Sequence, residues 1–198
     1  FSENEYLTMV TKQGVIKRTL LSEYAYHRKG GKIALNLDEG DELLHVLRTD
    51  GNSDVLLATH KGFAVHFEES AARTLGRTAR GVKAINLSEG DIVVGAVALS
   101  KDDERQILFI SENGYGKRSN ISEFPIHNRG GKGVTCHKAS EKLGQLCGID
   151  VVSDEDDVML ITNTGMIIRT RVSEISVYSR TAAGVRVMRI GDDMKIVS

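Results

Sequence analysis

The sequence is poor in tryptophan, proline, cysteine and long apolar runs. The last two shortages argue against a disulfide-stabilised small protein and against a membrane-spanning protein. The sequence contains no tryptophan, one proline and two cysteines among 198 residues, and aromatic residues make up 5%. Cys136 and Cys147 form no CxxC pair, so we expect two reduced thiols rather than a disulfide scaffold or a metal site. No apolar run approaches the roughly 18 residues of a membrane-spanning helix, and we therefore expect no membrane partner.

Net charge is also nearly absent, at −1, which taken alone argues against a nucleic-acid partner. The charges are, however, sorted along the chain. Acidic residues gather in turns such as 38–42 and 154–157, whereas lysine and arginine gather in glycine-containing loops and on neighbouring strands. If the units that carry these segments superpose, a nearly neutral chain can still present a continuous positive band.

What the sequence does contain is a repeated unit of about 50 residues. One glycine stands at the same turn of each unit, at separations of 48, 52 and 51 residues: Gly14, Gly62, Gly114 and Gly165. A serine follows each glycine by eight residues and a cation follows it by fifteen, the cations being Lys29, Arg77, Arg129 and Arg180. Three features in one register indicate a propeller or another array of supersecondary units.

Each unit contains short runs of β-branched residues and leucine bounded by glycine, asparagine and aspartate. In the first unit this pattern predicts strands at 6–11, 15–21, 32–37 and 42–49. The third strands of the later units are expected at 81–87, 133–137 and 184–190. We therefore predict one all-β, β-propeller-like domain of about four four-stranded blades, with repeats at approximately 1–50, 51–100, 101–152 and 153–198. Four blades are few for a closed ring, so we expect an open arc or a ring completed by further units. A β-sandwich pair is the alternative, but sandwiches rarely keep one register through four units.

The loop at 128–133 is the first candidate site, because three glycines lie in six residues beside two cations. Glycines let a backbone approach a partner closely, Arg129 offers a planar guanidinium to phosphate oxygens, and Lys132 adds a point charge. Equivalent basic loops lie at 27–32, 76–81 and 179–184. A row of such loops is suited to contacting the phosphates of a DNA duplex without reading its bases. The predicted DNA-binding residues of these loops are Arg28, Lys29, Lys32, Arg77, Arg80, Arg129, Lys132 and Arg180.

A second group of cations lies on the second strand of the repeats. Lys17 and Arg18 occupy this place in the first repeat, Lys117 and Arg118 in the third, and Arg169 in the fourth. We include these five among the predicted DNA-binding residues. The alternative, equally open at this point, is that they point outward and pair with the glutamates that follow each strand.

Catalytic motifs are missing. The sequence has no GxSxG, HExxH or Walker-type loop, and the run at 130–133 lacks the spacing and the following helix of a P-loop. The acidic turns carry no DxDxDG array, which disfavours calcium. We therefore expect no catalytic residue, no metal and no cofactor in this chain.

Several stretches, in the same order, resemble the C-terminal domain of the A subunit of DNA gyrase, a type IIA DNA topoisomerase. They include TKQGVIKRTLLSEY, GRTARGVKAINLSEGD, SENGYGKRSNISEF and NRGGKGV, and the resemblance covers essentially the whole chain. The equivalent domain of topoisomerase IV is a weaker match. The resemblance implies a β-pinwheel, in which blades exchange strands, and an outer rim that binds and bends duplex DNA irrespective of sequence.

The resemblance also implies how such a domain is used. Wrapping DNA on the rim supports ATP-dependent negative supercoiling by the whole gyrase, so an enzymatic parent is expected although this chain itself carries no catalytic residue. ATP and Mg²⁺ would be used elsewhere in the parent, a heterotetramer of gyrase A and B subunits. The expected location is the bacterial cytoplasm, in association with the nucleoid.

One departure concerns the family's signature box, glutamine-basic-Arg-Gly-Gly-Lys/Arg-Gly, which lies in the first of normally six blades. The nearest match here, residues 127–133, lies in the third repeat and lacks the glutamine. The chain also begins at Phe1 without methionine, so we expect a piece of a longer protein that covers the later blades. Two other functions stay open: a propeller that binds a protein partner and, less favoured, a propeller enzyme with a site in its central channel.

Overall fold

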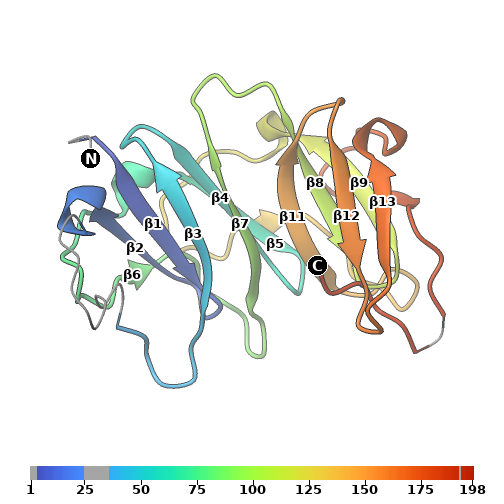
Figure 1. Ribbon diagram of the computed structural model, residues 1–198, viewed down its shortest axis with the longest axis horizontal. Helices are drawn as coiled ribbons and strands as arrows, with labels where there is room; N and C mark the ends of the chain where they lie inside the picture. The colour runs from blue at the N-terminus through green and yellow to red at the C-terminus, as the bar shows by residue number, and fades with distance from the viewer. Residues whose placement is uncertain (1–3, 25–35, 192) are drawn as a thin grey trace.

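The computed structural model describes residues 4–24, 36–191 and 193–198. These residues form fourteen β-strands and four short 3-10 helices, and they contain no α-helix. Three sheets have four antiparallel strands each, and a fourth sheet has two. We number these sheets as blades one to four, and they follow one another in chain order from left to right in Figure 1.

The strands of each blade lie side by side between an inner edge and an outer edge. From inner to outer edge, blade one consists of β3 (Leu43–Thr49), β1 (Tyr6–Thr11), β2 (Val15–Leu20) and β6 (Val82–Lys83). In the same direction, blade two consists of β7 (Val93–Leu99), β4 (Asp54–Thr59), β5 (Phe63–Glu68) and β10 (Val134–Thr135). Blade three consists of β11 (Leu146–Val152), β8 (Gln106–Ser111), β9 (Tyr115–Asn120) and β14 (Val185–Arg186). Blade four consists of β12 (Asp157–Ile161) and β13 (Ile167–Arg171).

Each of the first three blades is built from two repeats. Three strands come from one repeat and the outermost strand comes from the next, since β6 pairs with β2, β10 with β5 and β14 with β9. At the inner edge, β3 packs against β7, and β7 packs against β11. The all-β, propeller-like fold with exchanged strands is therefore confirmed, and the third strand of a repeat lies in the blade that precedes its own.

These exchanged strands are shorter than the sequence predicts, two residues each instead of the runs expected at 81–87, 133–137 and 184–190. The backbone enters each strand through a glycine that lies almost against the neighbouring chain. A Cβ on Gly133 would lie 2.2 Å from the Ala64 carbonyl oxygen, and one on Gly184 would lie 2.4 Å from the Gly116 carbonyl oxygen, each glycine having φ of +82°. Only glycine permits this approach. The matching strand of the first repeat, expected at 32–37, lies almost entirely outside the described residues.

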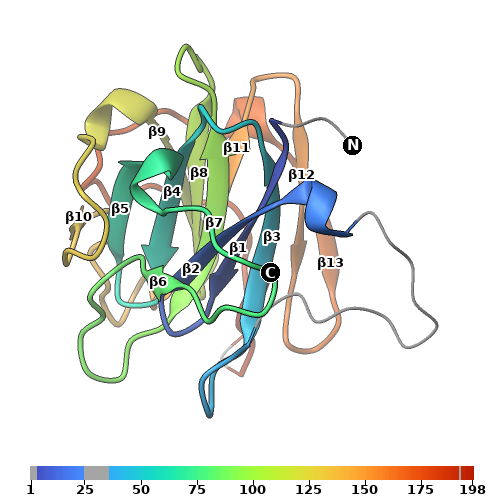
Figure 2. The ribbon, with the colours of Figure 1, turned by 90° about the vertical axis from the view of Figure 1, so that its left-hand side faces the viewer.

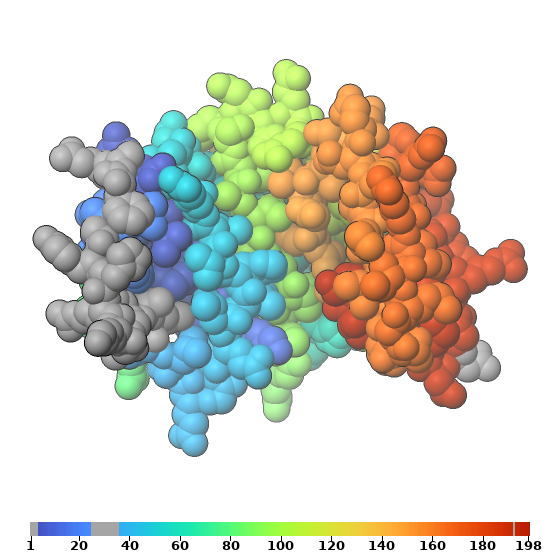
Figure 3. Space-filling model, viewed as in Figure 1, coloured from blue at the N-terminus to red at the C-terminus, as the bar shows by residue number. Residues whose placement is uncertain are grey.

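Blade four corrects the expectation of four strands in every unit. Its inner strand is represented by an isolated bridge between Thr162 and Ile196, and within the described residues no strand pairs with the outer edge of β13. Blades one and four lie at opposite ends of the longest axis, with the repeats as adjacent blocks between them (Figures 1 and 3). The four blades therefore form an open arc.

Apolar side chains fill the spaces between neighbouring blades. Val10 and Ile16 of blade one pack in one cluster with Phe67 of blade two, and Leu99 of blade two packs in the next with Phe109 of blade three. All five are at most 1% exposed. Blades two and three therefore bury both faces of their central strands, whereas the side chains of β13 in blade four are exposed or half-buried. Figure 2 shows the sheets one behind another from the side of blade one. Burial of apolar surface between them, at roughly 25 cal/mol per Å², is what holds the array together.

A turn of 3-10 helix follows the second strand of each repeat, at the Ser-Glu segments. The four turns are η1 (Leu21–Tyr24), η2 (Glu69–Ala71), η3 (Ile121–Glu123) and η4 (Val172–Glu174). The basic loops begin after these turns, so the turns fix where each loop starts.

Candidate nucleic-acid interface

The basic loops of repeats two, three and four lie next to one another at the outer edges of the blades. Arg129, in repeat three, donates from Nε to the Ala71 carbonyl and from Nη1 to the Lys83 carbonyl, both at 2.8 Å. Arg180, in repeat four, donates from Nη1 to the Thr135 carbonyl at 2.6 Å. Lys83 and Thr135 hold the same place in the exchanged strands β6 and β10. Each of these two arginines therefore joins its own loop to the outermost strand supplied by the preceding repeat.

Backbone hydrogen bonds join repeats two and three at the same edge. The Gly130 N–H donates to the Ala84 carbonyl at 2.7 Å, and the Asn86 N–H donates to the Gly131 carbonyl at 2.8 Å. The loops that carry Arg77, Arg129 and Arg180 therefore form one continuous row. We call residues 76–86, 128–135 and 179–186 the basic rim. Arg28, Lys29 and Lys32, predicted for the same row, lie outside the described residues.

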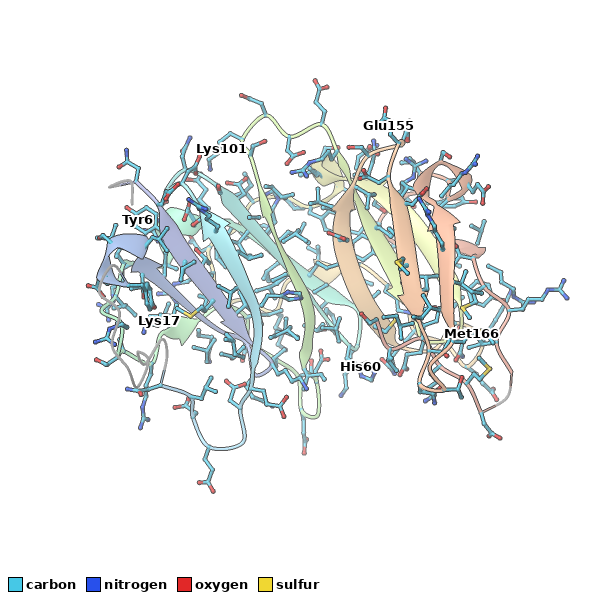
Figure 4. The ribbon with its side chains drawn as sticks, in the orientation of Figure 1. Tyr6, Lys17, His60, Lys101, Glu155 and Met166 are labelled. Atoms are coloured by element: carbon cyan, nitrogen blue, oxygen red, sulfur yellow. The ribbon has the colours of Figure 1, made fainter. Side chains whose placement is uncertain are left out.

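The two lysines of the second strands are buried beneath this rim. Lys17, marked in Figure 4, is 1% exposed, and its Nζ donates to the Arg77 carbonyl. Lys117 is 2% exposed, and its Nζ donates to the Arg180 carbonyl at 2.5 Å and to the Ala182 carbonyl at 2.8 Å. Burial lowers the pKa of both amines, that of Lys117 to about 8. Each lysine thus holds the backbone of a basic loop from below.

The arginines that follow these lysines are buried too. Arg18 donates from Nε to the Ala72 carbonyl at 2.9 Å and lies 3.3 Å from Glu69, whose side chain is 1% exposed. Arg118 donates from Nε to the Ile175 carbonyl at 2.6 Å and also contacts Asp154. Ala72 and Ile175 are the residues that directly follow and cap η2 and η4. Both arginines therefore anchor the point at which the next repeat leaves its 3-10 turn.

Blade two performs the same anchoring with different side chains. Val65 stands where the other blades have lysine, and His66 stands where they have arginine. His66 Nδ1 lies 2.8 Å from the carbonyl of Phe124, the residue that directly follows and caps η3, and Nε2 lies 2.9 Å from Asp54. The carbonyl can only accept, so Nδ1 donates. The acceptor is thus at the same position in all three blades, while the donor varies.

The prediction of direct phosphate contact by Lys17, Arg18, Lys117 and Arg118 does not fit this burial. The outward-pointing alternative does not fit it either. Alternation along a strand leads one to expect that one side chain of each pair is exposed. In the structure the neighbouring blade covers one face and the incoming loop covers the other, so both side chains are buried. We therefore no longer assign direct DNA contact to these four residues.

Other predicted residues lie at the surface. Lys132 and Arg80 are exposed on the basic rim, and Arg80 Nη1 lies 3.3 Å from Asp38 in an exposed ion pair. Arg77, Arg129 and Arg180 are half-buried. Arg169, at the place of Arg18 and Arg118 but in blade four, is exposed and bonds to Asp157 at 2.5 Å. An exposed ion pair of this kind stabilises by about 1 kcal/mol at most, so these cations can exchange their partner for a phosphate.

Two exposed cations of the rim are absent from the predicted DNA-binding residues, although both belong to the basic segments of the sequence. Lys83 and Arg186 are the last residues of the exchanged strands β6 and β14, and both are exposed. Each follows its loop arginine by six residues, and this spacing could have found them. Thr135 holds the same place in β10.

The acidic turns lie mainly elsewhere. The turns at 38–42 and 88–91 precede the inner strands β3 and β7, and the turn at 153–156 precedes β12. Figure 4 shows Glu155 of the last turn at the upper end of the molecule, on the same side as Lys101. Two contacts depart from this separation: Asp38 contacts Arg80, and Asp154 contacts Arg118. Acidic residues are thus concentrated toward the inner strands and cations toward the outer ones.

The inner side of the arc has a hollow of about 360 Å³ between β3, β7, β11 and β12. Its titratable lining residues are His45, Cys147 and Asp150, among apolar neighbours. Burial raises the pKa of the Cys147 thiol to about 12 and lowers the pKa of His45. A thiol that stays protonated at neutral pH is a poor nucleophile, so this hollow does not support an enzyme site.

Two further searches concern metals and membranes. No group of three or more histidine, cysteine, aspartate or glutamate side chains among the described residues could hold a metal ion. In the same part of the chain, no helix has the length and apolarity required to span a membrane.

Comparisons with known proteins give one consistent result. A family model described as the DNA gyrase C-terminal domain, beta-propeller, matches residues 5–50, 53–100, 105–153 and 156–198. The DNA gyrase A subunit of Staphylococcus epidermidis is 47% identical over 191 residues, which cover 96% of this chain and 21% of that protein. The same subunit of Staphylococcus aureus is 44% identical over 192 residues, which cover 97% of this chain and 22% of that protein. The chain therefore spans about a fifth of the length of these relatives.

Solved structures agree in fold. The C-terminal domain of DNA topoisomerase IV has a TM-score of 0.93 at 29% identity, covering 100% of this chain and 62% of that one. A DNA gyrase A C-terminal domain has a TM-score of 0.87 at 28% identity, covering 100% of this chain and 65% of that one. The E. coli ParC C-terminal domain, at 16% identity and a TM-score of 0.66 over 98% of this chain and 78% of that one, shares the fold.

Proposed function

The chain belongs to the family of DNA gyrase C-terminal β-propeller domains, and from this membership we propose that its basic rim binds and bends duplex DNA without sequence preference. The observation that carries the proposal is the continuous row of three loops joined by Arg129 and Arg180. The exposed cations of that row are Arg80, Lys83, Lys132 and Arg186.

A curved row of cations suits this task for an energetic reason. DNA has a persistence length of roughly 150 base pairs, so bending a short duplex costs several kcal/mol that many separate contacts must offset. Phosphate contacts from lysine and arginine release counterions and carry no sequence information. Cations repeated once per blade supply such contacts at regular intervals along the arc.

The test is binding of a fluorescent duplex of about 40 base pairs as salt is raised from about 50 to 200 mM. With four phosphate contacts, affinity should fall about 100-fold over this range and differ little between unrelated sequences. Replacing Lys83, Lys132 and Arg186 together with glutamine should weaken binding and flatten the salt dependence by about three contacts.

The matched control is Arg48→Gln, because Arg48 lies on the innermost strand β3 and pairs with Glu5 at 2.6 Å. It removes one positive charge, as each rim substitution does, but away from the rim. Affinity that stays flat with salt, or that responds equally to Arg48 and to the rim residues, would contradict the proposal. Arg129 is not a suitable test residue, because its guanidinium also holds its own loop.

In the parent protein, we extend the proposal to support of ATP-dependent negative supercoiling. The partners would be the rest of the gyrase A subunit, together with the gyrase B subunit. ATP and Mg²⁺ would be used outside this chain, in the bacterial cytoplasm and on nucleoid DNA. The rim variant placed in a whole gyrase should lose supercoiling of relaxed plasmid while DNA cleavage by the rest of the enzyme persists.

A second candidate is the equivalent role in topoisomerase IV, favoured by the TM-score of 0.93 to that domain. The two roles differ in what the DNA path on the rim is used for. A chimera of this chain with a gyrase core that introduces negative supercoils supports the first role. A chimera that only relaxes or decatenates supports the second.

A further inference from the structure

Lys117 is among the largest fully buried side chains of the protein, and its environment is specific. Its Nζ donates to the Arg180 and Ala182 carbonyls, and the ammonium lies 5.7 Å from the centroid of the Phe109 ring. A Cβ on Gly184 would lie 3.1 Å from the Lys117 Cβ, so the 179–184 loop is packed directly on this lysine.

Burying an ammonium group is costly unless its hydrogen bonds are met, and an apolar side chain of the same length would fill the space without that cost. The lysine therefore supplies something that packing alone does not need. Two carbonyls of one short loop are fixed by a single donor group. The charge also lies directly behind the loop, on the side away from solvent, where it is screened less than a surface charge.

We propose that Lys117 is a positioning residue for DNA binding, which holds the 179–184 loop in its bound shape and adds a positive charge beneath the rim. This inference rests on the proposed DNA binding of the rim. Lys17 makes the equivalent contact with the Arg77 carbonyl, whereas Val65 leaves blade two without such a lysine. A buried lysine therefore supports the loops at 76–81 and 179–184 but not the loop at 128–133.

The surroundings of Lys117 bring its pKa close to the neutral range, so that its charge depends on pH. Burial has the largest effect and lowers the Lys117 pKa to about 8; Cys136 and Glu123 act to raise it and Arg180 acts to lower it. Burial raises the pKa of Cys136 to about 12, and burial together with the nearby Lys117 charge lowers the pKa of His137. Between pH 7 and about 9.5 the thiol and the histidine therefore stay neutral, and among these three groups Lys117 is the one that titrates.

Loss of the Lys117 proton is expected to weaken DNA binding, but it has the opposite effect on the stability of the fold. Between about pH 8 and pH 10.5 the unfolded chain binds the Lys117 proton more tightly than the folded chain does, so this residue's contribution to the free energy of unfolding rises with pH. A lysine with a purely structural role would therefore give a protein that binds DNA no worse at pH 9.5. Weaker binding together with undiminished stability is the signature of a positioning charge.

The experiment measures affinity for a duplex of about 40 base pairs at constant ionic strength from pH 7 to about 9.5, with urea unfolding at each pH. The wild-type chain should bind about fivefold more weakly at the upper pH. Lys117→Met should bind about fivefold more weakly at pH 7 and lose most of the pH dependence. The double variant Lys17→Met/Lys117→Met should lose the remaining pH dependence of DNA affinity.

The matched control is Lys12→Met, since Lys12 is a partly exposed lysine that pairs with Glu42 at 2.8 Å in the β1–β2 turn. It should leave both affinity and pH dependence unchanged. Where Lys117→Met does not fold, Lys117→Arg and the wild-type profile decide: the permanent charge of arginine should remove the loss of affinity at high pH.

The outcomes separate the two proposals. A wild-type chain that does not bind DNA at pH 7 ends the proposed function and this inference with it. A chain that binds DNA, while the wild type shows no pH dependence or Lys117→Met keeps it, overturns the inference and leaves DNA binding standing.

Discussion

Blades one and three hold the incoming basic loop with a buried Lys-Arg pair, whereas blade two holds it with Val65 and His66. The backbone contact is the same in all three blades. Leu75, His127 and Tyr178 of the next repeat each donate an N–H to the carbonyl of the anchoring residue, which is Arg18, His66 or Arg118, at 2.7 to 2.9 Å. The docking of a loop is therefore set by the backbone, and the side chains beneath it can differ.

Where the lysine is missing, the loop's own arginine makes more contacts. Arg129, above blade two, donates to two carbonyls of the preceding repeat, whereas Arg180, above blade three, donates to one and has Lys117 beneath it. One loop is thus held from the side and the other from below. The comparison predicts that equivalent substitutions will have unequal effects in the two places.

The largest expected effect comes from removing the anchoring side chains of the second strands. Arg18→Met should lower the free energy of unfolding by about 3–5 kcal/mol, because it leaves Glu69 buried without its cation. His66→Leu should cost about 1–2 kcal/mol, because Asp54 keeps Lys101 at 2.5 Å. Urea unfolding of both variants measures the difference. Equal losses of stability in the two variants would show that leaving Glu69 without a cation costs no more than removing one partner of Asp54.

A smaller effect is expected from the loop arginines. Arg129→Gln should lower the exchange protection of the Gly130 amide about tenfold, because the two carbonyl contacts of the side chain are lost. Arg180→Gln should change protection of the Val187 amide by about threefold or less, since Lys117 still holds its loop. Native-state hydrogen exchange measures both changes. A larger loss of protection in Arg180→Gln than in Arg129→Gln would contradict the view that Arg129 holds its loop whereas Lys117 holds the loop of Arg180.

The smallest effect concerns the exchanged strands, where Thr135 interrupts the series of Lys83 and Arg186. Thr135→Lys should strengthen duplex binding about two- to fivefold and steepen the salt dependence by about one contact. Lys138→Gln provides a comparison, because Lys138 is exposed just beyond the same strand. If adding a cation at 135 leaves the salt dependence unchanged, the outer edge of blade two does not contact DNA.

Much of the fold could be predicted from local signals. The strands expected at 6–11 and 15–21 are found at Tyr6–Thr11 and Val15–Leu20, because β-branched runs and turn glycines mark them directly. The place of the third strand could not be predicted from composition, because a two-residue strand such as β10 has almost no pattern of its own. Its position depends on the glycine approach to Ala64 and on the next loop, which are contacts between repeats.

The positions of the basic loops in the candidate site could be predicted from the sequence, but the burial of the lysines beneath them could not. The sequence located the loops of Arg77, Arg129 and Arg180, and their shared register implied that they would be neighbours. It contained no sign that Lys17 and Lys117 are buried, since a lysine on a short strand is usually solvated.

The sequence by itself determined the repeat, the hairpins and the sorting of charges, because turn glycines and short apolar runs act over a few residues. Only the tertiary structure decided which blade each exchanged strand joins and which cations face solvent. The physical reason is that a side chain's exposure depends on what covers both faces of its sheet, and in this fold one of those faces is covered by the repeat that follows.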